Sequence, residues 1–282
     1  MKKMILKIFL PVFSIILLFS SCLGDSETTF EQSRSFSYIG TYDGVQYAAT
    51  ASGYKITSDV IKGQLTAGQC YYLSFKLGSG SASSNGIYNA DMSGTPELIK
   101  ASAFSLSTPP TTPPANSDSL YVNVFNVGNR SPVDYYGDRW HFAYTWQKRG
   151  DETSVAQFFY DKTNQIDADG TEINTSTSSE RENKAIIDVY LTKTNLDENG
   201  VAQSDTKETV ANLSTFKATF NANPDSEKDI VTDGSTKYVR VAIKFRYWAI
   251  NATTKLKEQK YLGSWSVSES NTTNSYYILI KQ

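Results

Sequence analysis

The chain has 282 residues, with 27 Lys and Arg against 29 Asp and Glu, two cysteines and one histidine. This near balance of charge gives no electrostatic reason to bind nucleic acid or anionic lipid headgroups. One histidine and two cysteines also supply too few ligands for a zinc site and too few partners for a histidine-assisted nucleophile. We therefore predict a non-enzymatic protein with no metal or cofactor and no nucleic-acid partner.

Residues 1–21 have the pattern of a bacterial export signal. Three lysines stand within the first seven residues, and an apolar run follows from Ile8 to Phe19. The run is shorter than the ~20 residues that a membrane-spanning helix needs, so cleavage is favoured over an uncleaved anchor. A plain signal peptide would need no cysteine, yet Cys22 stands directly after two serines.

The segment LLFSSC resembles a bacterial lipobox, although Phe19 occupies a position where Leu, Val or Ile is usual. The resemblance implies that Cys22 is lipidated after cleavage and that its acyl chains hold the protein on a bilayer. The alternative is a chance cysteine at the end of a plain signal. Without residues 1–21 the chain keeps 24 Lys and Arg against 29 Asp and Glu. Membrane contact is therefore expected to come from lipid.

After residues 22–33, which we predict to be a flexible tether, residues 34–107 read as a small β-barrel. Asp43-Gly44 between two strand-like runs is typical of a β-hairpin. In QCYYLSFKL, Tyr71, Leu73, Phe75 and Leu77 alternate with the residues of a second face. About five short strands fit an OB-like barrel. With Cys22 lipidated, Cys70 has no partner for a disulfide within the chain.

Four of the eight prolines lie in STPPTTPPANSDS, and residues 108–118 are predicted to be a linker between two domains. The neighbouring DSL matches a short O-glycan acceptor pattern of exported Bacteroidota proteins. That resemblance makes Ser119 a candidate glycan acceptor.

Residues 119–282 contain about eight strand-like runs and predict an antiparallel, immunoglobulin-like β-sandwich. In RWHFAYTWQK, four aromatic residues alternate with polar ones. We expect the aromatic face to be core and His141, on the other face, to be exposed to solvent. In YVRVAIKFRYWAI every second residue from Val239 to Ala249 is predicted to face the core. Trp265 is also predicted to be core.

Few residues in this region suggest chemistry. Trp248 and Arg246 share the polar face of their strand, so they are candidate ligand contacts, for example to a sugar ring; stacking between them is the structural alternative. IDADGTE offers Asp167 and Asp169 before Gly170, but this only partly matches a calcium loop, and we expect an ordinary turn. The other acidic residues cluster in polar loops, where we expect them to be solvated. We therefore do not expect a pair of catalytic carboxylates of the glycosidase type.

The LLFSSC leader, the strands around LTAGQCYYLSFKL and the aromatic strand RWHFAYTWQ together resemble the NigD-like lipoproteins of Bacteroidota. The resemblance implies an OB-like domain followed by a β-sandwich, in an envelope protein without known catalytic residues. We predict an outer-membrane lipoprotein, in the periplasmic or the cell-surface leaflet, that binds or scaffolds. Two alternatives stay open. One is a surface lipoprotein that binds carbohydrate, and the other is a fimbrillin-type pilus component that polymerises by strand donation.

Overall fold

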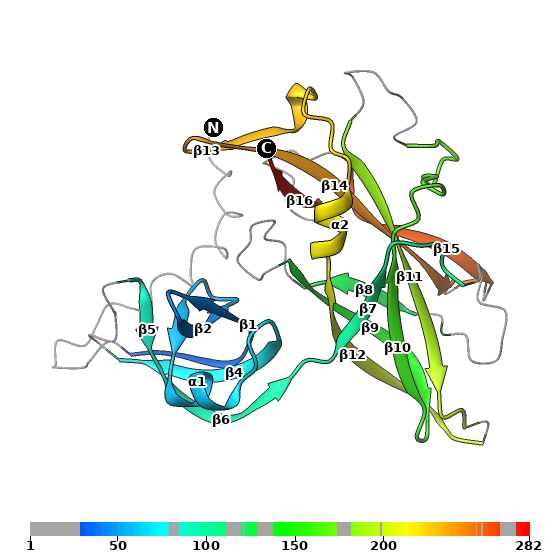
Figure 1. Ribbon diagram of the computed structural model, residues 1–282. Helices are drawn as coiled ribbons and strands as arrows, with labels where there is room; N and C mark the ends of the chain where they lie inside the picture. The colour runs from blue at the N-terminus through cyan, green and yellow to red at the C-terminus, as the bar shows by residue number, and fades with distance from the viewer. Residues whose placement is uncertain are drawn as a thin grey trace, which may run out of the picture.

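A computed structural model describes residues 29–78, 85–110, 120, 122–128, 138–173, 182–197, 199–251, 253–254, 256–265 and 275–282. Cys22 and Ser119 lie outside these residues, as does most of the predicted linker. The described part is nearly all β, as predicted, with a barrel-like sheet followed by a second, larger sheet (Figure 1). None of its helices has the length and apolar character needed to cross a bilayer.

The first sheet has six strands within the described residues, in the order β5-β3-β2-β1-β4-β6. The hairpin predicted at Asp43-Gly44 is confirmed, because Tyr42 pairs with Val45 and both turn residues have positive φ. The strands are β1 (Phe30–Tyr42), β2 (Val45–Thr50), β3 (Lys55–Thr57), β4 (Cys70–Leu77), β5 (Ile87–Asn89) and β6 (Asp91–Leu98). Strand β1 thus begins inside the range expected to be tether.

The two faces of β4 have different roles. Tyr71, Leu73, Phe75 and Leu77 belong to the core of the first sheet, together with Ile39 and other buried residues. On the opposite face Cys70 and Tyr72 are also buried, but they pack against the second sheet instead. Ser74 is half-buried and Lys76 is exposed on that face, so the alternation read from the sequence is correct and the second face is covered only at its start.

The second sheet has ten strands within the described residues, eight of them in the order β13-β14-β11-β10-β7-β12-β9-β8, with β15 and β16 also paired to β14. They are β7 (Ala101–Ser105), β8 (Val124–Val127), β9 (Arg139–Arg149), β10 (Thr153–Phe159), β11 (Lys184–Thr194), β12 (Ala202–Asn212), β13 (Ile230–Asp233), β14 (Thr236–Ile250), β15 (Lys257–Leu262) and β16 (Tyr276–Lys281).

Strand β7 falls within the range predicted for the barrel, but it pairs with β10 and β12 of the second sheet. Both of these pairings are parallel, and so is the pairing of β11 with β14. The other pairings in this sheet are antiparallel. Alternation shows that a strand exists, but it does not show which strand lies beside it.

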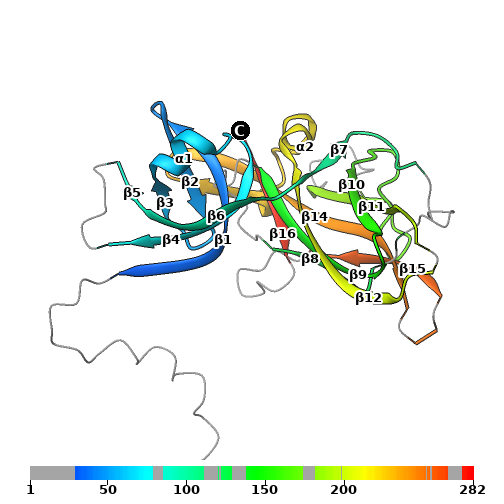
Figure 2. The same cartoon turned by 90° about the horizontal axis from the view of Figure 1, so that it is seen from below.

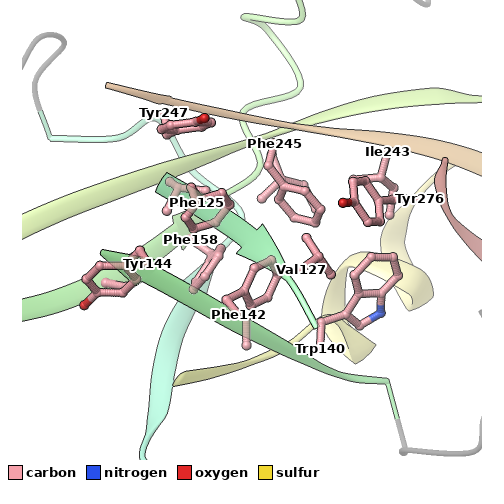
Figure 3. Close-up of a cluster of buried hydrophobic side chains, with 14 of the residues drawn as sticks. Phe125, Val127, Trp140, Phe142, Tyr144, Phe158, Ile243, Phe245, Tyr247 and Tyr276 are labelled. Atoms are coloured by element: carbon pink, nitrogen blue, oxygen red, sulfur yellow. The ribbon is translucent and has the colours of Figure 1, made fainter. Parts of the chain in front are cut away.

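The core of the second sheet is built from aromatic rings (Figure 3). Trp140, Phe142, Tyr144 and Trp146 on β9 are at most 4% exposed. Phe142 lies between the rings of Phe158 and Phe245, at centroid distances of 4.5 and 5.0 Å. The predicted core face of β14 is buried throughout. Burial of these rings contributes a large hydrophobic term to the stability of the fold.

Two six-residue helices, α1 (Asp59–Gln64) and α2 (Ser214–Thr219), were not expected from the sequence, and a 3-10 turn, η2, spans Glu227–Asp229. Helices this short show no helical repeat of apolar residues. Helix α1 begins at a local signal: the Ser58 hydroxyl accepts a hydrogen bond from the Ile61 backbone N–H at 3.1 Å. Helix α2 buries Phe216 against the second core.

Candidate functional site

Figures 1 and 2 show the first sheet beside the second, larger one. The two sheets meet where side chains of β1 and β4 contact β9 and β12. Phe36, Cys70, Tyr72, Ile99 and Val210 form a small buried cluster there, which we call the interface cluster. Burial raises the pKa of the Cys70 thiol to about 12. The thiol therefore stays protonated and unreactive at neutral pH, and its role is packing.

His141 lies beside the interface cluster, so the prediction that it faces solvent is wrong. Its side chain is 12% exposed. The ring stacks on Phe36 at a centroid distance of 4.9 Å, and Nε2 lies 2.9 Å from the Tyr72 hydroxyl. Alternation correctly placed His141 on the face of β9 opposite the aromatic core. That face is covered by the first sheet, which only the tertiary fold reveals.

Arg34 closes the edge of this interface. It sits at a β-bulge in β1 and has a φ of 48°, an uncommon conformation for a residue with a side chain. The bulge lets the guanidinium stack 3.8 Å from the centre of the Tyr72 ring. Its nitrogens also lie 3.0 Å from Glu208 and 3.4 Å from Glu97. Arg34 therefore links β1 to β6 and to β12 of the second sheet.

Glu208 is the charged centre of this group. Partial burial disfavours its charge, but hydrogen bonds from Tyr72 and Arg34 outweigh burial and lower the pKa of Glu208. Burial raises the pKa of Tyr72 and lowers that of His141. A neutral His141 with its proton on Nε2 can donate to Tyr72, whose hydroxyl then donates to Glu208. This arrangement joins the two sheets, and Arg34, Phe36, Tyr72 and Glu208 also line a surface hollow of about 460 Å³.

Acidification is expected to weaken this interface. Burial lowers the pKa of His141 below its usual 6.5, so the unfolded state binds more protons as the pH falls from 6.5 toward the folded value. The free energy of unfolding should decrease across this window. The stabilisation from Glu208 should be lost further down, as the pH falls below 4.5 through its lowered folded value. Urea unfolding measured between pH 7.5 and 5.0 tests the first step.

Because the chain has one histidine, a His141→Gln variant should show a flatter dependence of stability on pH in that range. Gln147→Ala, an exposed position near the end of the same strand β9, is a control that should keep the wild-type slope. Equal slopes in wild type and His141→Gln would contradict the assignment.

The predicted ligand contacts Arg246 and Trp248 lie on the polar face of β14. Arg246 is 5% exposed and forms a bidentate ion pair with Asp188 of β11, with N–O distances of 2.5 and 2.8 Å. It also donates to the backbone carbonyls of Asn164 and Ile166. The guanidinium thus fastens the loop before β11 to the sheet. Trp248 is half-buried and pairs across strands with Gln259.

A hollow of about 470 Å³ lies over this face, lined by Arg246, Tyr261, Gln259 and the loop around Asp167. Asp167 is held by the Lys244 ammonium at 2.8 Å and accepts a hydrogen bond from the Trp265 indole. Trp265 is half-buried in this polar cluster, so the prediction that it is core is wrong. Asp169 accepts a hydrogen bond from the Thr171 N–H, as in an ordinary turn.

The structure therefore places Arg246 and Trp248 on one face of β14. The Arg246 guanidinium, however, is already bonded to Asp188 and to the loop carbonyls. Whether Trp248 contacts a ligand stays a prediction. Sequence reasoning missed three residues that bind these polar side chains. Asp188 pairs with Arg246, Glu208 pairs with Arg34, and Tyr72 lies within hydrogen-bond distance of His141. Asp188 had a signal in the sequence, because it interrupts the apolar run AIIDVYL. A charge inside a buried strand is expected to have a charged partner.

No protein-family model matches the sequence. No curated protein matches it either. Solved structures do resemble the fold. An uncharacterised protein from Parabacteroides merdae is 14% identical with a TM-score of 0.57, over 82% of this chain and 96% of that one. A candidate lipoprotein from Bacteroides fragilis is 10% identical with a TM-score of 0.47, over 83% and 96% of the two chains.

A NigD-like immunity protein from Bacteroides caccae is also among these neighbours, as the resemblance in the sequence predicted. It is 11% identical with a TM-score of 0.43, over 81% of this chain and 91% of that one. At such identities the likeness concerns the fold alone. The chain shares its fold with the Parabacteroides merdae protein along nearly the whole length of that protein.

Proposed function

We propose that the protein is a lipid-anchored component of a bacterial outer membrane with a non-catalytic binding or scaffolding role. The observation that carries this proposal is the leader, a basic and apolar segment that ends in LLFSSC. An all-β body follows from Phe30 onward, so acyl chains on Cys22 would hold the folded part near the bilayer.

The position of the histidine supports a role without catalysis. The His141 side chain is 12% exposed and contacts Phe36, Tyr72 and Glu208 between the two sheets, and its contacts are those of a packing residue. Among the described residues, no group of three or more His, Cys, Asp or Glu side chains is placed to hold a metal ion. Binding or scaffolding through the β surfaces is the role that we propose.

Glycan binding at the face of β14 is the second candidate. Its support is the hollow over this face, which is lined by Tyr261 and by Gln259, the cross-strand neighbour of Trp248. The bonds that hold Arg246 to Asp188 and to the loop reduce this support. Assembly into a pilus gains no support from the described residues.

Labelled palmitate tests the anchor. Cells that make the full chain should incorporate the label into the protein, and Cys22→Ala should abolish incorporation and release the protein from the membrane fraction. Cys70→Ala is the matched control, because Cys70 is the one other cysteine and is 3% exposed. It should keep wild-type labelling. Label that persists in Cys22→Ala would sink the proposal.

A further inference from the structure

A second pocket lies where the larger sheet is split. Strand β7 pairs with β10 only at Gln157–Phe159 and with β12 only at Val210–Ala211. Strands β10 and β12 both extend beyond these pairs, without β7 between them. A pocket of about 340 Å³ occupies this split and is lined by Lys100 and by residues of β7, β9, β10, β11 and β12. The volume is at the lower end of the range for small-molecule sites.

The inner part of the pocket is rich in hydroxyl groups. Tyr144, Ser154 and Thr209 are at most 7% exposed. The Tyr144 hydroxyl donates to Ser154 Oγ at 3.0 Å, and Thr209 Oγ1 donates to the Lys100 carbonyl at 2.8 Å. Ser102 Oγ lies 2.7 Å from Thr209 Oγ1. Because Ser154 accepts from Tyr144, its own hydroxyl hydrogen is left to donate into the pocket.

The charge of the lining is positive. Lys207 stands directly opposite Tyr144 in the β9–β12 pair, so both side chains project from the same face. Lys100 also lines the pocket, and no acidic residue does. Within the described residues, neither lysine has a carboxylate within ion-pair distance. Asp205 precedes Lys207 on this face, and its charge helps to raise the pKa of the Tyr144 hydroxyl. Asp205 is not part of the pocket lining.

The rest of the lining is small and apolar. Ala101, Ala103, Val155 and Ala156 leave space for the ring carbons of a ligand. A compact molecule could therefore place an anionic group on Lys207, hydroxyls against Ser154 and Thr209, and its carbon face on the alanines.

We propose that this pocket binds a small hydroxylated carboxylate, such as a uronic acid, with Lys207 as the residue that recognises the carboxylate. A lysine is a point charge that suits a single carboxylate, and hydroxyl side chains can both donate to and accept from sugar hydroxyls. The inference adds a ligand class to the binding role proposed above. It does not depend on the lipid anchor, so the two can fail separately.

Ligand-observed NMR titration of the full mature chain in detergent micelles, at low salt, tests the pocket. D-glucuronate should bind, and D-glucose, which has the same ring without the carboxylate, should bind at least about tenfold more weakly because the charge contact is absent. Inorganic phosphate is the third probe, and it should not match glucuronate. Lys207→Gln should weaken glucuronate binding by about tenfold or more, while Lys207→Arg should retain most of it.

Lys76→Gln is the matched control, because Lys76 is an exposed lysine on β4 of the first sheet. It should leave binding unchanged. Thermal unfolding of each variant shows whether the fold is kept. Absence of glucuronate binding to the wild type would overturn the proposal. Equal affinity in Lys207→Gln and wild type would also overturn it, as would equal affinity for glucuronate and phosphate.

Discussion

Replacing Phe245 with alanine is expected to lower the free energy of unfolding by about 3–5 kcal/mol, because the change removes a buried ring and leaves a cavity. Phe245 is completely buried. Its ring centroid lies 5.0 Å from that of Phe142 and 5.9 Å from those of Trp140 and Tyr276. Few other positions touch so many aromatic neighbours in the larger core (Figure 3). Urea unfolding followed by tryptophan fluorescence measures the change.

Val201→Ala is the control for this measurement, because Val201 is 77% exposed. A surface substitution of this kind usually changes stability by no more than about 0.5 kcal/mol. If Phe245→Ala costs less than about 1 kcal/mol, Phe245 is not at the centre of the core that we describe.

The second large effect is expected at the ion pair between Arg246 and Asp188. Both side chains are at most 8% exposed, so Arg246→Met would leave a buried carboxylate without its partner. Such a loss typically costs about 3–5 kcal/mol. The loop that contains Asn164 and Ile166 should also become more susceptible to proteolysis, because Arg246 donates to both carbonyls. Urea unfolding and limited proteolysis measure the two effects.

A double variant and a surface ion-pair variant serve as comparisons for Arg246→Met. The double variant Arg246→Met with Asp188→Leu should recover much of the lost stability, because no uncompensated charge remains. Lys260→Met breaks an ion pair with Glu258 that is largely exposed and should change stability little. A single Arg246→Met variant as stable as Lys260→Met would show that the pair is not structurally important.

The sequence predicts the strands and cores of this fold well, because alternation directly reports which side chains are buried together. The aromatic face of β9 and the apolar face of β14 are both buried as expected. The Asp43-Gly44 hairpin is also where local turn chemistry places it. In each case the signal lies within one strand or one turn.

The relations between strands are harder to predict. The parallel pair of β11 and β14 brings Asp188 opposite Arg246, although 58 residues separate them. Strand β7 belongs to the second sheet, because its neighbours are β10 and β12, and no local feature of its sequence says so. The partly covered second face of β4 and the environment of His141 depend in the same way on contact between the two sheets.

The candidate sites show the same division. Trp248 and Arg246 could be placed on one face from alternation alone. The ion pair of Arg246 with Asp188 could be suspected only because Asp188 is a charged residue inside an apolar strand. The pocket beside β7 had no signal in the sequence, because its hydroxyls and lysines come from five strands and the residue before β7, which meet only in the fold.

We propose that the mature protein begins at a lipid-modified Cys22. Mass spectrometry of the N-terminal peptide, from protein extracted from its native membrane, tests this claim most directly. We predict a peptide that starts at Cys22 and carries a diacylglycerol on the sulfur and an acyl group on the amine. An unmodified peptide that starts at another residue, or one that retains the leader, would contradict the account.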